Sequence, residues 1–181
     1  MKYVVLLRKI NVGKANRINK KSLEETFKAL GYASVEIYIN SGNVIFTTSK
    51  AKSTISKEVE KALHVLFKTH IQFLVKTINE MKEIGKAIPD EWKNNDEQRT
   101  DVAFLFHEID HPRLINELPI KKEFVKMKYV RGAVIMNVQR ENVFKSQYSK
   151  IIGSKAYKFM TIRNVNTARY LSGIEKVDRM H

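Results

Sequence analysis

Two histidines with the spacing of metal ligands are the first feature of the sequence that suggests chemistry. Residues 107–111 read His-Glu-Ile-Asp-His, which matches the H-E-x-x-H pattern of zinc proteases. That pattern requires a helix, on which both histidines face one metal ion and the glutamate acts as a base. Here Pro112 follows directly and disfavours helical angles at His111, and the residues before the motif have the pattern of a strand. We therefore expect no metal site here.

Other familiar reaction signatures are missing. The chain has no cysteine, which excludes disulfides, thiolate metal sites and a cysteine nucleophile. It also lacks the phosphate-binding loop G-x-x-x-x-G-K-[ST], the dinucleotide fingerprint G-x-G-x-x-G and the serine elbow G-x-S-x-G. No cofactor is expected, and the sequence alone assigns no catalytic residue.

The spacing of apolar residues predicts a β-α-β-β-α-β order in the first half of the chain. Strands are expected at 3–7, 35–39, 44–46 and 71–75, and amphipathic helices at about 22–30 and 55–66. This order is the split βαβ, or ferredoxin-like, arrangement. A further helix is expected at 77–88, where Thr77 and Glu80 have the spacing of a capping box.

The second half partly repeats that order. Residues 89–99 are polar and turn-rich, and they are the one stretch long enough for a linker. Beyond them we expect strands at 102–106, 124–129 and 133–138, and helices at 112–118, 143–152 and about 164–176. The predicted fold class is α+β, with two ferredoxin-like halves at 1–88 and 100–181 packed together, the second carrying an extra terminal helix.

Positive charge is concentrated in two segments. The 181 residues include 33 Lys and Arg against 19 Asp and Glu, a net charge of +14. Residues 1–21 hold seven basic and no acidic residues, and residues 121–169 hold twelve basic and two acidic ones. If these segments meet in the fold, they form a positive face that attracts anions. The alternative is a solvated surface on which the lysines only maintain solubility.

Three segments of the chain resemble one known family. Residues 6–13 are similar to the opening L-L-R-G-I-N-V-G of the family catalogued as domain of unknown function 1697, and residues 38–46 to its Y-I-Q-S-G-N-V-V-F segment. Ser149-Lys150 matches an S-K pair of the family, and residues 161–167 resemble its T-x-R-N-x-N-T signature. Lys9 stands where the family usually has glycine. The resemblance implies a bacterial protein with two ferredoxin-like halves and no established reaction.

The polar residues of these segments are rich in hydrogen-bond donors and cations, and they include neither a carboxylate nor a histidine. Such a set suits recognition of phosphate or carboxylate groups. The candidate ligand-binding residues are Arg8, Asn11, Gly13, Ser41, Asn43, Lys150, Arg163, Asn164, Asn166 and Thr167. Structural roles are the alternative: positive φ at the glycines, capping of the last helix by Asn164 or Asn166, and pairing of the arginines with internal carboxylates such as Glu36 or Glu175.

We expect five of these residues to converge on one concave surface: Arg8, Asn11, Lys150, Arg163 and Asn164. Arg8 and Asn11 leave the end of the first strand, and Lys150 lies at the end of one predicted helix. Asn164 begins the last helix, whose free amide groups attract anions, with Arg163 beside it.

The function that the sequence favours is binding of a phosphate-bearing ligand, either a small molecule such as a nucleotide or a nucleic acid such as RNA. The aromatic signature of the RNA-recognition fold is not evident. One alternative is a small enzyme that positions a phosphorylated or carboxylate substrate electrostatically, with Lys150 as nucleophile if it is desolvated. Another is an interaction module whose basic face is incidental. No apolar run is long enough to cross a membrane, so we expect a cytoplasmic protein.

Overall fold

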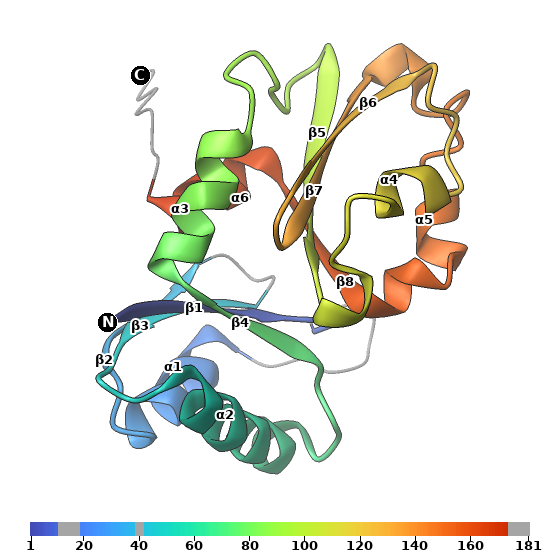
Figure 1. The fold of residues 1–181 in the computed structure, drawn as a ribbon. Coiled ribbons are helices and arrows are strands. Elements are labelled where there is room, and N and C mark those ends of the chain that lie inside the picture. The colour runs from blue at the N-terminus through green and yellow to red at the C-terminus, as the bar shows by residue number, and fades with distance from the viewer. Residues whose placement is uncertain (11–18, 39–41, 174–181) are drawn as a thin grey trace. The chain divides into compact units, whose positions relative to one another are not determined.

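The computed structural model describes residues 1–10, 19–38 and 42–173. Contacts between Cα atoms divide the chain into two units, Met1–Ile78 and Asn79–His181, and each is described by itself (Figure 1). Within the described residues, no helix has the length and apolar character needed to cross a bilayer.

The first unit has the predicted β-α-β-β-α-β order. Its elements are β1 (Lys2–Leu7), α1 (Lys20–Ala29), β2 (Ala33–Tyr38), β3 (Asn43–Thr47), α2 (Lys52–Phe67) and β4 (Phe73–Thr77). The strands form one antiparallel sheet in the order β2-β3-β1-β4, and both helices lie on the same side of it (Figure 1). This is the ferredoxin-like topology.

The core of the first unit lies between this sheet and its two helices. The side chain of Asn19 caps α1 by accepting a hydrogen bond from the Ser22 N–H at 2.7 Å, which directs Phe27 onto the sheet. Phe46 of β3 packs beneath Phe27 and stacks on Tyr32, with 4.4 Å between the ring centres of Tyr32 and Phe46. All three rings are buried, so aromatic packing fixes α1 on the sheet.

The second unit repeats the strand order of the first. Its strands are β5 (Gln98–Leu105), β6 (Val125–Val130), β7 (Ala133–Gln139) and β8 (Met160–Asn164). They form an antiparallel sheet in the order β6-β7-β5-β8, so that the first and third strands are central in both units. The prediction of two ferredoxin-like halves in an α+β protein is confirmed.

Helices cover both faces of the second sheet (Figure 1). On one face, α4 (Leu114–Glu117) and α5 (Lys150–Gly153) bury Leu114 and Ile151 against residues of β5 and β7. On the other, α6 (Val165–Ser172) lies against β5 and β8, on the side where α3 (Ile78–Ala87) also lies. Short 3₁₀ turns complete the unit: η1 (His107–Ile109), η2 (Arg140–Asn142) and η3 (Ala156–Phe159).

Two elements differ from the sequence-based expectation. The predicted helix at 143–152 is a series of turns followed by the short α5, because Gln147 adopts a left-handed conformation with φ of 57° that interrupts a helix. In addition, β8 forms a strand that the apolar pattern did not predict. The segment 89–97 is hydrogen-bonded to β5 and η2: the Thr100 hydroxyl donates to the Lys93 carbonyl at 2.6 Å, and Arg140 Nε donates to the Asn95 carbonyl at 2.8 Å.

Candidate functional site

The residues predicted to bind a ligand are distributed over both units. Arg8 and Asn43 belong to the first unit, whereas Lys150, Arg163, Asn164, Asn166 and Thr167 belong to the second. Asn11, Gly13 and Ser41 lie outside the described residues. A common surface for Arg8, Asn11, Lys150, Arg163 and Asn164 therefore stays a prediction.

In the first unit, both described candidates hold neighbouring segments of the chain together. The Arg8 side chain is buried and donates from Nη1 to Oε1 of Gln72 at 3.0 Å. Asn43 is fully buried, and its Nδ2 donates to the Tyr38 carbonyl at 3.0 Å, from the first residue of β3 to the last of β2. These contacts stabilise the end of β1 and the pairing of β2 with β3.

In the second unit, β8 carries the T-x-R-N signature with alternate residues on opposite faces. Thr161 and Arg163 share a face and are both buried, and Arg163 Nη1 donates to the Thr161 hydroxyl at 2.8 Å. The same nitrogen donates to the Ile162 carbonyl at 3.0 Å. Burial lowers the pKa of Arg163 to about 10, and Tyr157 opposes that shift. The guanidinium is therefore engaged with its own strand.

The start of α6 is capped by Asn164. Its side-chain oxygen accepts a hydrogen bond from the Thr167 N–H at 2.9 Å, which satisfies one of the free amides of the first turn. Thr167 itself is buried, and Asn166 is exposed on the same turn. Asn164 therefore has the helix-capping role that was considered for it.

A buried carboxylate that the sequence analysis missed lies next to Asn164. Asp101 of β5 is the partner of Asn164 in the β5–β8 ladder, so the two side chains lie on the same face of the sheet. Asp101 Oδ2 accepts hydrogen bonds from the Tyr148 hydroxyl at 3.0 Å and from Arg99 Nε at 2.7 Å. The Arg99 guanidinium also lies 4.8 Å from the centre of the Tyr148 ring. Asp101 thereby connects β5 to the segment that carries Ser149 and Lys150.

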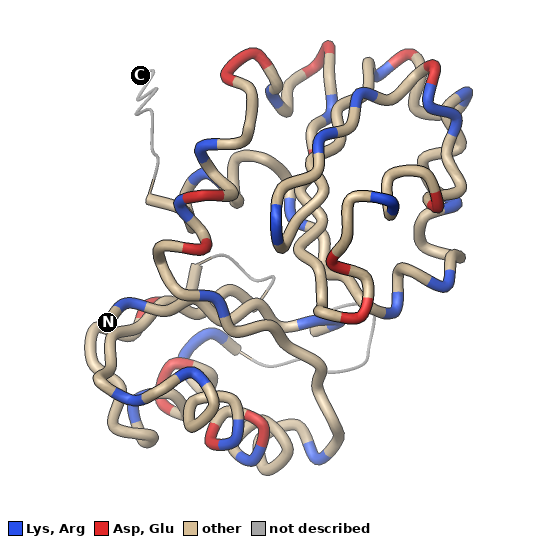
Figure 2. Tube along the Cα trace, viewed as in Figure 1, with Lys and Arg blue, Asp and Glu red and all other residues tan. Residues whose placement is uncertain are grey.

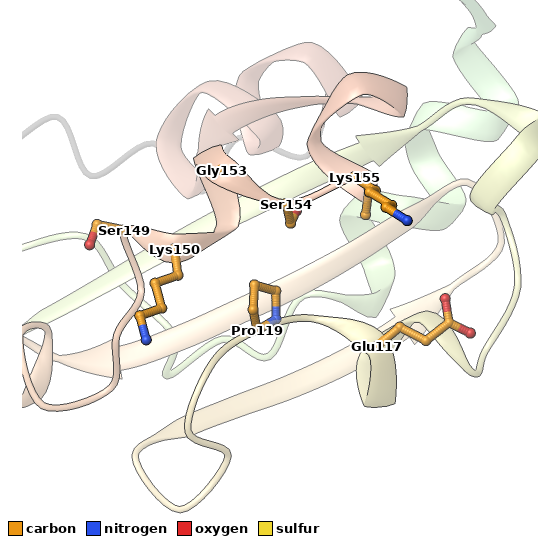
Figure 3. Close-up of a pocket in the computed structure, with 8 residues that line it drawn as sticks. Glu117, Pro119, Ser149, Lys150, Gly153, Ser154 and Lys155 are labelled. Atoms are coloured by element: carbon orange, nitrogen blue, oxygen red, sulfur yellow. The ribbon is translucent and has the colours of Figure 1, made fainter.

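An open depression of about 700 Å³ surrounds Lys150 (Figure 3). One side is formed by α5 and the turn after it, with Ser149, Lys150, Ser154 and Lys155, and the other by the residues around Pro119. Glu117 supplies the one carboxylate among the lining residues. Both lysines are exposed, so the depression offers two positive charges and the Ser149 hydroxyl to a ligand, whereas the Ser154 hydroxyl donates to the Ile151 carbonyl at 2.7 Å.

The surroundings of this depression are also basic. Lys and Arg recur along β6 and through the segment that contains α5 and η3 (Figure 2). Lys145 and Lys158 on either side of α5 are exposed. Lys126 and Lys128 on β6 are also exposed, but they alternate with Val125 and Met127, which pack on the α5 side, and so face the other side of the sheet. The basic character of residues 121–169 therefore belongs to one unit and does not depend on the first.

The H-E-x-x-H motif does not lie on one helix. Residues 107–109 form η1, and Asp110 after it accepts hydrogen bonds from the Tyr129 hydroxyl at 2.9 Å and from the Gly132 N–H at 2.8 Å. Within the part of the chain that the structure describes, no three His, Cys, Asp or Glu side chains are grouped to hold a metal ion.

Comparison with known proteins shows the family of the chain. The family model described as "Protein of unknown function (DUF1697)" matches residues 1–135, and the chain belongs to this family. A solved structure, the conserved bacterial protein SP0830 from Streptococcus pneumoniae, is similar in fold, with a TM-score of 0.82 and 24% sequence identity over 96% of this chain and 97% of that one. No curated protein shows significant sequence similarity to the chain.

Proposed function

We propose that this member of the DUF1697 family binds a phosphate-bearing ligand at the depression beside α5. The observation that carries the proposal is the grouping of Lys150, Lys155, Ser149 and Ser154 around one opening of about 700 Å³. That volume lies within the range of about 300–1,000 Å³ that small-ligand sites occupy. Lysines bind phosphate as point charges, and a serine hydroxyl such as that of Ser149 donates a hydrogen bond to one of its oxygens.

The packing beneath the depression supports this proposal because it holds the backbone of Lys150 in place. Tyr148, immediately before Ser149, is buried and bonded to Asp101. Ile151, one residue after Lys150, is buried in the core of the unit. The lysine therefore projects from a segment anchored on both sides, which reduces the entropy lost when a ligand binds.

The charge balance restricts where the phosphate group would lie. Glu117 repels an anion, whereas Lys150 and Lys155 attract it. Lys150 and Glu117 project at well-separated places around the opening (Figure 3). We therefore place the phosphate of the ligand on the α5 side, next to Lys150. An enzymatic role for Lys150 would need a desolvated amine, and its exposure favours binding instead.

The test compares lysines inside and outside the depression. The probes are inorganic pyrophosphate, followed by calorimetry, and a labelled single-stranded RNA of about 12 nucleotides, followed by fluorescence anisotropy at about 50 and about 200 mM salt. Lys150→Gln and Lys155→Gln are the test variants, and Lys57→Gln on the exposed side of α2 is the matched control.

We expect each test variant to weaken binding of both probes and to reduce the log–log salt slope for RNA by about 0.7, the value for one lost contact to a single strand. Lys57→Gln should bind like the wild type. Wild-type protein that binds neither probe at low salt, or equal losses in the control, would exclude this site.

A further inference from the structure

Phe144 differs from the other phenylalanines of the protein because its side chain is exposed to solvent. All nine phenylalanines lie within the described residues, and eight are buried or partly buried. Phe144 is 94% exposed, more than any other large hydrophobic side chain that the structure describes. Exposing a ring of this size forgoes the hydrophobic stabilisation that the other eight provide, so this position contributes little to the fold.

The backbone that carries Phe144 is nevertheless well held. The Phe144 carbonyl accepts from the Gln147 N–H at 3.1 Å, and the Gln147 carbonyl accepts from the Lys150 N–H at 2.9 Å. Ser146, two residues after Phe144, is fully buried, and its carbonyl accepts from the Lys121 N–H at 2.9 Å. The ring therefore projects from an anchored turn and presents its faces to solvent at a defined place.

Positive charge accompanies the ring. Lys145 is adjacent and exposed, and Lys150 follows six residues after Phe144 through two successive turns. Each of the two turns brings its first and last Cα atoms within about 7 Å, so the Cα atoms of Phe144 and Lys150 are at most about 14 Å apart. An aromatic face next to a line of cations is the combination that binds single-stranded nucleic acid, because bases stack on the ring while phosphates contact the cations.

We propose that Phe144 is a base-stacking platform and that the ligand of the depression beside α5 is therefore single-stranded nucleic acid. This inference rests on the proposed function and specifies its ligand class. The twelve basic and two acidic residues of 121–169 favour this occupant over an apolar protein surface, which charge would not attract. One base would stack on Phe144 while neighbouring phosphates of the strand contact Lys145 and Lys150.

The experiment separates base stacking from phosphate binding with two probes of equal charge. One is a labelled single-stranded oligonucleotide of about 12 residues, and the other is an abasic strand of the same length. The variants are Phe144→Ala, Phe144→Trp and, as a matched control in the first unit, Val65→Ala, which removes another exposed apolar side chain. Thermal melting checks that each variant folds.

We expect Phe144→Ala to weaken binding of the base-bearing strand by about 5- to 140-fold, the equivalent of 1–3 kcal/mol per stacked base. Binding of the abasic strand and the salt slope should not change, because no charge is lost. Phe144→Trp should bind like the wild type, since tryptophan also stacks, and Val65→Ala should have no effect.

Other outcomes overturn the proposal in distinguishable ways. If Phe144→Ala binds both strands like the wild type, the stacking role is excluded while the phosphate site stands. If the wild type binds neither strand, the proposed function itself fails. A loss of self-association or of binding to anionic vesicles in Phe144→Ala, with unchanged oligonucleotide binding, assigns the ring to a different partner and also excludes the stacking role.

Discussion

The hydroxyl of Tyr148 donates a hydrogen bond to the buried carboxylate of Asp101 at 3.0 Å, over 47 positions of sequence. Both residues are nearly inaccessible to water, at 5% exposure each. Arg99 donates from Nε to the same carboxylate oxygen at 2.7 Å, and its guanidinium lies over the tyrosine ring, 4.8 Å from the ring centre. The segment with Phe144, Ser149 and Lys150 is thereby fixed to the central strand of the second sheet.

Tyr148→Phe should destabilise the second unit. The substitution keeps the ring in the core and removes one of the two described donors to a buried carboxylate, which costs about 1–3 kcal/mol. Urea unfolding measures the change in the free energy of unfolding. Asp101→Asn and the double variant complete a thermodynamic cycle, in which we expect a coupling energy of about 0.5–3 kcal/mol. Additive effects of the two single variants would contradict the contact.

Alkaline pH should destabilise the protein through the same residue. Burial, followed by the charge of Asp101, raises the pKa of Tyr148 above its ordinary value of 10.0. The unfolded chain therefore loses the phenolic proton first, so the stability that this group contributes is complete below about pH 10 and is lost as the pH rises further.

The free energy of unfolding should fall as the pH rises above about 10, and less steeply in Tyr148→Phe. Part of this fall in stability should remain in Tyr148→Phe, because the pKa of Tyr32 is also raised. Burial is the main cause of that shift, and the hydrogen bond to Glu58 adds to it. Equal slopes in the wild type and the variant would show that the Tyr148 proton is not linked to folding.

Gly42→Ala should be much more destabilising than Gly31→Ala. Both glycines have positive φ, 74° at Gly42 and 78° at Gly31, so alanine is strained at either position by about 1–2 kcal/mol. At Gly42 a Cβ would also lie 2.5 Å from Ile10 Cδ1 and 2.8 Å from Leu7 Cβ, whereas nothing lies within 4 Å at Gly31. Overpacking should add about 1–3 kcal/mol. Thermal or urea unfolding of both variants measures this difference, and equal losses would refute it.

Arg163→Lys distinguishes a structural from a ligand-binding arginine. The buried guanidinium donates to Thr161 and Ile162 within its own strand, and a lysine cannot reproduce the fork of donors. We expect a loss of about 1–3 kcal/mol in the free energy of unfolding and unchanged oligonucleotide affinity. Unchanged stability together with weaker binding would instead place Arg163 in the ligand site.

Much of the fold could be predicted because the strands and helices show clear apolar periodicity. The continuous apolar run at 3–7 corresponds to β1, and the alternation at 35–39 to β2. In β8, Met160 and Ile162 alternate with Thr161 and Arg163, which is the pattern of a strand with one polar face. The polar residues of such a strand ordinarily face water, whereas Thr161 and Arg163 are buried. The left-handed conformation of Gln147 could not be predicted, because glutamine, unlike glycine, does not favour a positive φ.

The candidate site could be predicted only in part. Lys150 was identified from its motif, and it lies at the depression. Asp101 was missed because its partners Tyr148 and Asn164 are distant in sequence and meet it only through the β5–β8 pairing and the packing of the loop before α5. Lys9 adopts a φ of 56°, a left-handed conformation that glycine favours and that a lysine does not reveal in the sequence.

Glu117→Gln should strengthen binding of a phosphate-bearing ligand. The carboxylate of Glu117 lines the same depression as Lys150 and Lys155 and repels an anion there. Because the depression is open to solvent, the repulsion is screened, and its removal should improve affinity by about 1.5- to 5-fold, the equivalent of 0.2–1 kcal/mol. The gain should shrink as salt is raised. Titration of labelled RNA into Glu117→Gln, with Glu25→Gln on the exposed face of α1 as control, measures the effect. Equal gains in both variants would reflect net charge alone and would remove Glu117, and the depression it lines, from the binding site.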